Sequence, residues 1–208
     1  HTAYRRQRQM CIRDSYHAVR TLERAGADCI QIEDQISPKR CGHFNGKEVI
    51  STDEMLGKIK AAVDARRDQG TLIMARTDAC ATQGFEAAVE RAQRFAEAGA
   101  DILFVEAVTQ AEEIRALPQR LSTPQLMNMV IGGKTPITDA GELADLGYGL
   151  VLYANAALQG AVAGMQRALG QLRNERRVDE NPAVVAPFAE RQRLVNKPFW
   201  DALEKKYE

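Results

Sequence analysis

Short apolar runs alternate with longer amphipathic stretches along most of this chain. The runs are almost unbroken, as expected of strands covered on both faces, and they lie at 29–32, 71–75, 102–105, 125–127 and 150–153. In the stretches between them, apolar residues recur at helical spacing, as at Met55, Ile59 and Ala62. Glycines such as Gly99 and Gly147 close these stretches and are common helix stops. The pattern predicts strands and helices in alternation.

This alternation predicts an α/β fold with a parallel sheet and right-handed crossovers. The expected strands begin near positions 28, 71, 101, 125 and 149, a spacing close to the ~31 residues per unit of a (β/α)8 barrel. Only five such units occur within residues 16–175. We therefore expect a member of the (β/α)8 TIM-barrel family with an incomplete barrel. A doubly wound open sheet is the alternative, although its GxGxxG fingerprint is missing.

The two ends of the chain differ from this repeating part. Residues 1–15 carry four arginines and one aspartate without an apolar period, so we expect a disordered or foreign basic tail. Residues 176–208 hold short amphipathic pieces between prolines, with Phe188, Phe199 and Trp200 in need of an apolar partner. We expect this helical extension to dock on a neighbouring subunit, which predicts a homo-oligomer.

Composition and charge narrow the functional class. The chain has 28 lysines and arginines and 28 aspartates and glutamates, so it lacks the basic excess of a typical nucleic-acid-binding protein. It contains no apolar run of membrane-spanning length and no stretch that resembles a signal peptide. The four cysteines lack CxxC spacing, which argues against a zinc site or a disulfide framework. We expect a cytoplasmic protein that binds a small molecule rather than a nucleic acid or a membrane.

Polar residues follow the expected strands at matching positions. At the ends of the first four strands they are Glu33 and Asp34, Arg76, Thr77 and Asp78, Glu106, and Asn128, and Asn155 follows the fifth strand. Because the carboxyl ends of parallel strands meet at one face of a barrel, these side chains should converge on a common mouth. Carboxylates suit Mg²⁺, a guanidinium suits a substrate carboxylate, and an amide can donate to a developing oxyanion. The alternative is that these residues cap helices and pair with each other.

The longest connection, residues 35–50, is polar and holds a cysteine among cations. Cys41 follows Lys39 by two positions and precedes Gly42 and His43. Nearby positive charge lowers the pKa of a thiol toward neutrality, and the thiolate is the reactive form. A connection of this length after a strand often acts as a catalytic loop. The alternative is an exposed loop with an incidental cysteine.

Four stretches of the chain resemble the isocitrate lyase / phosphoenolpyruvate mutase superfamily: IEDQISPKRCGHFNGKEVI, IMARTDA, LFVEA and NMV. The resemblance runs from about Tyr16 to the end. It is strongest for the small members, which include methylisocitrate lyases, dimethylmalate lyases and proteins named carboxyvinyl-carboxyphosphonate phosphorylmutase. It implies a (β/α)8 barrel with Mg²⁺, or Mn²⁺, at the strand ends. It also implies a homo-oligomer, a tetramer in intact members, with C-terminal helices exchanged between subunits.

The resemblance further implies a carbon–carbon lyase of carboxylic acid metabolism. A 2-hydroxy di- or tricarboxylate, similar to methylisocitrate or dimethylmalate, would lose its hydroxyl proton and break into a 2-oxo acid and a carboxylate. Cys41 would protonate the departing fragment, with Lys39 and His43 as further catalytic residues. Glu33 would be a metal ligand. The residues that would contact the substrate are Gly42, Arg76, Glu106 and Asn128.

The chain also departs from this superfamily. The Asp-Thr-Gly-Tyr-Gly stretch, whose aspartates bind Mg²⁺ most directly, and the serine-glycine substrate loop do not occur in it. We therefore expect this chain, as an N-terminally truncated member, to have weak or no activity by itself. The alternatives within the same superfamily are a phosphorus–carbon mutase and an oxaloacetate decarboxylase, and outside catalysis an inactive fragment.

Overall fold

The computed structural model describes the backbone of residues 2–39, 46, 48–136 and 139–208, and their side chains from residue 12 onward. In chain order its elements are α1 (Thr2–Arg24), β1 (Cys29–Glu33), α2 (Thr52–Ala65), β2 (Leu72–Thr77), α3 (Ala79–Gln83), α4 (Phe85–Glu97), β3 (Ile102–Val105), α5 (Ala111–Arg120), β4 (Leu126–Asn128), α6 (Ala140–Leu146), β5 (Leu150–Leu152), α7 (Ala156–Glu175), α8 (Phe188–Leu194) and α9 (Lys197–Tyr207).

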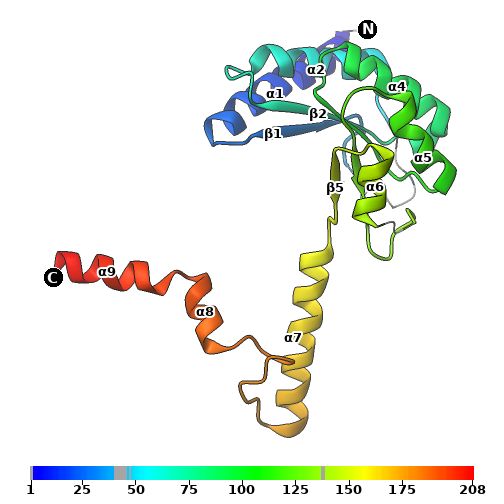
Figure 1. Cartoon of the computed structure of the whole chain (residues 1–208). Coiled ribbons are helices and arrows are strands. Elements are labelled where there is room, and N and C mark those ends of the chain that lie inside the picture. The colour runs from blue at the N-terminus through cyan, green and yellow to red at the C-terminus, as the bar shows by residue number, and fades with distance from the viewer. Residues whose placement is uncertain (1, 40–45, 47, 137–138) are drawn as a thin grey trace. The chain divides into compact units, whose positions relative to one another are not determined.

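The strands are parallel and neighbours in sequence are neighbours in space (Figure 1). β1, β2 and β3 form one sheet in that order, and β4 pairs with β5. A parallel bridge between Leu103 and Gln125 joins β3 to the segment that leads into β4. The predicted α/β fold with a parallel sheet is therefore confirmed, whereas the incomplete barrel stays a prediction.

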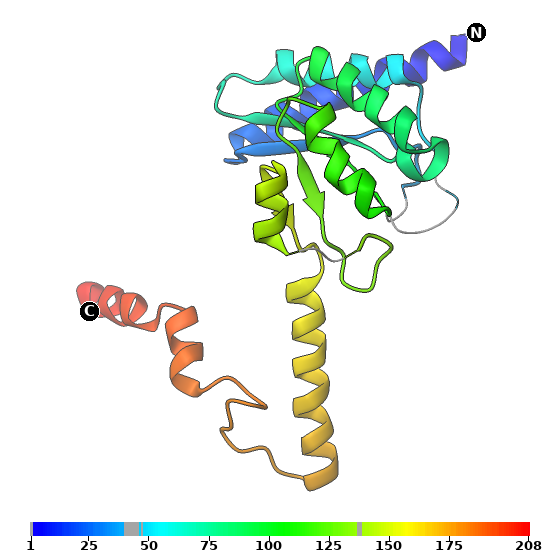
Figure 2. The same ribbon diagram turned by 45° about the vertical axis from the view of Figure 1, so that its right-hand side comes forward.

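The two faces of the β1–β3 sheet carry different side chains, because successive residues of a strand point to opposite faces. On one face Ile73, Ala75 and Leu103 are buried against α1, α2 and α4, which cover the sheet (Figure 2). We call this the helix face. The opposite face, which we call the inner face, holds a cluster of Met74, Ile102, Phe104 and Leu126.

Local signals act as the sequence predicts. The hydroxyl of Ser51 caps α2 by accepting a hydrogen bond from the Glu54 N–H at 3.2 Å. Gly99 and Gly147 follow α4 and α6 with φ angles of 103° and 104°, a left-handed conformation that glycine adopts without a steric penalty. A Cβ at Gly99 would also approach Cγ2 of Val63 to 3.2 Å.

The first described residues belong to a helix. Helix α1 begins at Thr2, and the expectation of a disordered or foreign tail over residues 1–15 stays a prediction. Ile12 packs over Gly57 of α2, with its Cδ1 3.3 Å from the position of an added Cβ, and Ser15 is buried. Ile12, Ser15 and Val19 are spaced three and four residues apart, which places them on one side of a helix.

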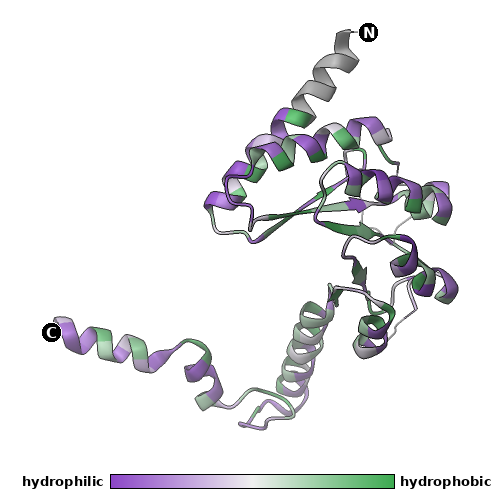
Figure 3. Ribbon diagram, turned by 45° about the horizontal axis from the view of Figure 1, so that its top comes forward, coloured by the Kyte–Doolittle hydropathy of each residue, from purple (hydrophilic) through white to green (hydrophobic). Residues whose placement is uncertain are grey.

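The chain divides into a unit that ends at Ala154 and a second unit, Asn155–Glu208. This boundary lies before α7. The extension expected at 176–208 would place it after α7. The described side chains of α7 include no buried residue, and apolar residues lie along the helix (Figure 3). Within the part of the chain that the structure describes, every helix falls short of the length and hydrophobicity that a membrane crossing requires.

Leu117 provides a test of the core. It lies on α5 and is fully buried, so Leu117→Ala should lower the free energy of unfolding by about 2–5 kcal/mol through lost burial and a residual cavity. Leu22→Ala on α1, where the side chain is 45% exposed, is the matched control and should cost less than about 1 kcal/mol. Urea denaturation measures both, and equal losses would contradict the packing described above.

Candidate active site

The predicted strand-end residues lie together on the inner face of the sheet. Glu33 pairs in register with Arg76, and Arg76 pairs with Phe104. Glu106 follows Phe104 by two positions, so it belongs to the same face. Asn128 ends β4 and its amide contacts Glu106. The structure therefore brings together residues that are almost a hundred positions apart in sequence.

The guanidinium of Arg76 is the centre of this group. Its Nε and Nη2 donate to the two carboxylate oxygens of Asp78 at 2.9 and 3.0 Å. Its Nε lies 3.3 Å from Oε2 of Glu33, and its Nη1 lies 3.7 Å from Oε2 of Glu106. The guanidinium carbon also lies 5.0 Å from the centre of the Phe104 ring, a cation–π distance. One cation thus links three carboxylates from three strand ends.

Burial and the neighbouring carboxylates shift the pKa of Arg76 in opposite directions. The side chain is 14% exposed, and burial by itself lowers the pKa of Arg76. The hydrogen bonds to Asp78 and the charges of Glu106 and Glu33 outweigh burial, so the pKa of Arg76 is raised above its usual value. Arg76 is therefore a fixed positive charge at this site.

Asn128 and Glu106 present acceptors toward the same space. The Asn128 side-chain amide donates to Oε2 of Glu106 at 3.3 Å, and Glu106 is 1% exposed. That hydrogen bond orients the amide, which leaves its Oδ1 buried without a hydrogen-bond partner among the described residues. A buried acceptor without a donor is unfavourable, so Oδ1 is suited to accept a hydrogen bond from a ligand.

The connection after β1 contributes one described cation to the site. Lys39 Nζ lies 2.8 Å from Oε1 of Glu33, and Lys58 of α2 donates to the backbone carbonyl of Glu33 at 3.1 Å. The predicted catalytic residues Cys41 and His43, and the predicted substrate contact Gly42, lie outside the described residues. Their roles stay predictions.

The described residues do not by themselves form a Mg²⁺ site. Among them, no group of three or more histidine, cysteine, aspartate or glutamate side chains is placed to hold a metal ion. Both carboxylate oxygens of Glu33, the predicted ligand, face cations: Oε1 faces Lys39 and Oε2 faces Arg76. Since Mg²⁺ requires several oxygen ligands around it, Glu33 could supply one ligand, and the others would have to come from elsewhere.

The sequence placed Asp78 among the polar residues at the strand ends without a specific role, and in the structure it holds Arg76 most directly. The signal was present, because Asp78 follows Arg76 by two positions and side chains two apart share a face of a strand. What the sequence did not show is that Asp78 binds Nε and Nη2 of Arg76, while Nη1 lies 3.7 Å from Oε2 of Glu106.

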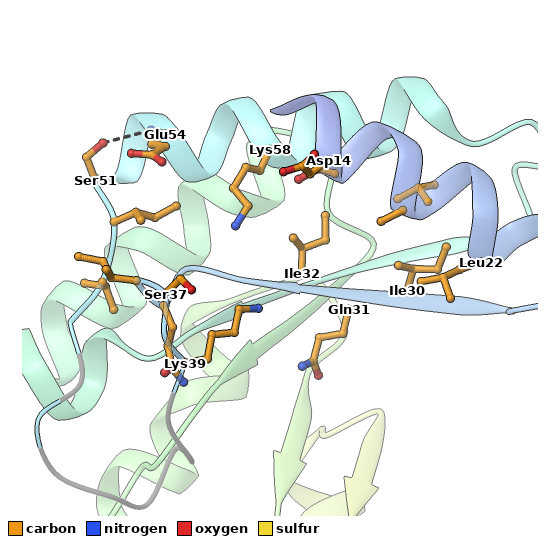
Figure 4. A pocket seen from close by; sticks show the side chains of 17 residues that line it. Asp14, Leu22, Ile30, Gln31, Ile32, Ser37, Lys39, Ser51, Glu54 and Lys58 are labelled. Carbon is orange, nitrogen blue, oxygen red and sulfur yellow. Dashed lines mark hydrogen bonds between the residues drawn. The ribbon is translucent and has the colours of Figure 1, made fainter. Parts of the chain in front are cut away.

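A cavity of about 700 Å³ lies elsewhere, along β1 beneath α1 and α2. Figure 4 shows Ile30 and Ile32 on the side of β1 that faces α1, and Gln31 on the opposite side. Of the predicted site residues that the structure describes, Lys39 alone lines this cavity. We therefore assign the candidate site to the Arg76 cluster and not to this cavity.

Known proteins resemble this chain over most of its length. The family model of phosphoenolpyruvate phosphomutase matches residues 12–173. The 2-methylisocitrate lyase of Aeropyrum pernix is 49% identical over 154 residues, which cover 74% of this chain and 49% of that protein. The crystal structure of a 2,3-dimethylmalate lyase superposes with a TM-score of 0.75 at 36% identity, over 81% of this chain and 58% of the other.

A further similar structure was solved with bound ligands. A phosphonopyruvate hydrolase crystallised with oxalate and Mg²⁺ superposes with a TM-score of 0.79 at 28% identity, over 94% of this chain and 68% of that chain. The chain spans about half the length of the curated relatives that it matches.

Removal of the central cation tests the electrostatics of the cluster. In Arg76→Met, Glu33, Asp78 and Glu106 lose their shared counter-ion, and the variant should lose about 3–5 kcal/mol of stability near pH 7.5. Three carboxylates left close together without a cation repel one another, which adds to this loss. Urea denaturation near that pH measures it.

Arg94→Met is the control, because Arg94 forms an exposed ion pair with Asp53 at 2.8 Å. Such a pair contributes at most about 1 kcal/mol. An Arg76→Met variant as stable as the parent near pH 7.5 would show that the cluster does not depend on the guanidinium.

Proposed function

Because this chain belongs to the phosphoenolpyruvate phosphomutase family, we propose that it is the catalytic part of a carbon–carbon lyase. The proposed substrate is a 2-hydroxy di- or tricarboxylate similar to methylisocitrate or dimethylmalate, which is cleaved to a 2-oxo acid and a carboxylate. The observation that carries the proposal is the convergence of Arg76, Glu33, Glu106 and Asn128 on one face of the sheet.

Each of these residues has a role that its contacts support. Nη1 of Arg76 lies beyond hydrogen-bond distance from Glu106, while Nε and Nη2 are held by Asp78. We place a substrate carboxylate at Nη1. Glu106 and the unpartnered Oδ1 of Asn128 are both acceptors, which suits them to bind the 2-hydroxyl group and hold its proton as the adjacent carbon–carbon bond breaks.

The bond electrons then pass to the departing fragment, which becomes an enolate-like carboxylate. The thiol of Cys41 would donate its proton to that carbanion, and the thiolate would regain the proton released by the hydroxyl. A thiol with a pKa near neutrality suits both steps. Lys39 contacts Glu33, which supports a place for this connection beside the cluster.

The charge of the cluster supports a requirement for an added cation. The described charged side chains at its centre are three carboxylates and two cations, Arg76 and Lys39. With Lys58 at the Glu33 carbonyl, three cations balance the three carboxylates. A substrate brings two or three further carboxylates, so we propose that the whole protein uses Mg²⁺ or Mn²⁺ with ligands beyond the described cluster. The related phosphonopyruvate hydrolase binds Mg²⁺.

Phosphorus–carbon chemistry is the second candidate, since that neighbour acts on a phosphonate by its name. Oxaloacetate decarboxylation is a further outcome of the same enolate chemistry. An assay with Mg²⁺ distinguishes them, in a hybrid in which residues 16–175 replace the matching part of the A. pernix lyase. There 2,3-dimethylmalate or 2-methylisocitrate should release pyruvate, phosphonopyruvate should release no phosphate, and EDTA should abolish turnover. Phosphate release alone would favour the second candidate.

Cys41→Ser tests the proton donor. We would make it in a hybrid in which residues 16–175 replace the matching part of the A. pernix lyase, because this chain spans about half of that relative. Loss of a positioned general acid should lower kcat on the order of a hundredfold or more. Cys29→Ser is the control, since Cys29 is exposed at the start of β1. Unchanged turnover in Cys41→Ser would refute the thiol as donor.

We also propose that unit 2 assembles the protein into a homo-oligomer, a cytoplasmic tetramer in the intact protein. Leu158, Met165 and Leu169 are 64%, 56% and 64% exposed on α7, and their spacing places them on one side of the helix. A contiguous exposed apolar surface of this kind marks an association site.

A charge on that side of α7 tests the assembly. Leu169→Glu should shift the chain to a smaller species, because a carboxylate would be buried in the interface. Asn174→Glu adds the same charge on another side of α7 and should leave the mass unchanged. Sedimentation velocity measures both, and identical distributions for parent and Leu169→Glu would exclude this surface as the contact.

A further inference from the structure

A second layer of polar residues lies directly behind the candidate site. Asp34 follows Glu33 by one position and Thr77 follows Arg76 by one, so their side chains point to the helix face and not to the inner face. Both side chains are fully buried. The sequence placed both among the polar residues at the strand ends, but in the structure their side chains lie in this buried layer and not in the candidate site.

Asp34 is hydrogen-bonded to the end of β2 through its carboxylate. Oδ2 accepts a hydrogen bond from the Thr77 hydroxyl at 2.7 Å, and Oδ1 accepts one from the backbone N–H of Asp78 at 2.9 Å. Asp78 in turn holds the guanidinium of Arg76 with both of its own oxygens. The Asp34 carboxylate therefore fixes the backbone of the residue that orients Arg76.

Arg91 reaches Asp34 from the outer helix α4. It is 6% exposed, its Nε donates to Oδ2 of Asp34 at 3.2 Å, and its Nη2 lies 3.1 Å from the same oxygen. Nη2 also donates to the backbone carbonyl of Ile50 at 2.7 Å. One guanidinium thus contacts both the residue that follows β1 and a residue that precedes α2.

Residues 34–36 and 48–50, which we call the neck, join the two ends of the connection after β1. The N–H of Ile50 donates to the carbonyl of Asp34 at 2.8 Å, and the N–H of Ile36 donates to the carbonyl of Glu48 at 2.9 Å. An antiparallel bridge pairs Gln35 with Val49. Arg91 closes this neck from the helix side, because it bonds the Ile50 carbonyl while the Ile50 N–H is bonded to Asp34.

We propose that Asp34 and Arg91 are positioning residues of this site: their ion pair fixes the neck to the end of β2 and thereby sets the orientation of Asp78 and Arg76. The inference deepens the proposed function and rests on it for the importance of Arg76. Neither residue touches the space in which a substrate would bind, since both side chains belong to the helix face.

The energetics of buried ion pairs favour positioning over simple stabilisation. A buried pair contributes little net stability compared with apolar residues of similar volume, since the cost of desolvation offsets the attraction. A fully satisfied buried network does fix one geometry, because each donor and acceptor has a required partner. Here the partners are backbone groups at Ile50 and Asp78, which lie on two different connections.

Hydrogen exchange followed by NMR tests this on the chain itself, without any assay of turnover. Three protons probe the neck and the site: the backbone amides of Ile50 and Asp78 and the side-chain Nε–H of Arg76. A fourth, the amide of Leu103, donates to the carbonyl of Pro124 in the sheet at 2.9 Å and serves as the reference. In Arg91→Met we expect exchange to accelerate about tenfold or more at Ile50, Asp78 and Arg76, with Leu103 unchanged.

Arg94→Met is the matched control: the same substitution on the same helix, at an exposed pair with Asp53, should leave all four protons unchanged. Unchanged exchange at Asp78 and Arg76 in Arg91→Met would overturn the proposal. An equal acceleration at all four protons would also overturn it, because that result indicates a merely structural role.

Arg91→Lys is the second test variant, to be measured if Arg91→Met does not fold. A lysine keeps a cation beside Asp34 but cannot donate in the two directions of a guanidinium. We expect faster exchange at Ile50 with Leu103 unchanged, and unaltered exchange at Ile50 would count against the proposal. Because these readouts need no substrate, absence of lyase activity in the hybrid with the A. pernix lyase would defeat the proposed function and leave this test intact.

Discussion

The guanidinium of Arg76 allows three acidic side chains to share one small region. Glu33, Asp78 and Glu106 approach from three connections, and Glu106 and Asp78 are almost fully buried. Without a central cation, their mutual repulsion and the cost of burying charge would drive them apart or protonate them. The arrangement of the strand ends therefore depends on a positive charge whose protonation the carboxylates themselves reinforce.

Side chains alternate between the two faces of the strands, so the polar residues of this region form an inner layer at the candidate site and an outer layer beneath the helices. Glu33 and Arg76 face the inner side, where a ligand can approach, while the residues that follow each of them face the helices. The outer layer is tied to α4 through Arg91, so the packing of a helix on the sheet bears on the geometry of the site.

The site that the described residues build has the groups to hold carboxylates and a hydroxyl, but not to hold a metal by itself. The chain spans about half the length of its curated relatives. The balance of charge in the cluster and the buried acceptor on Asn128 are both consistent with a site whose ligands and cation come partly from beyond these residues.

The sequence by itself determined the strands, the helices between them, the parallel α/β fold and the group of polar residues at the strand ends, because those features follow from local periodicity, caps and the geometry of parallel strands. Only the tertiary structure decided how the side chains pair. It extended α1 to Thr2, turned Arg76 onto Asp78 and joined Asp34 to Arg91 across 57 positions. Pairing of this kind depends on which charges meet in a low-dielectric interior, and that is set by packing between elements rather than by spacing along the chain.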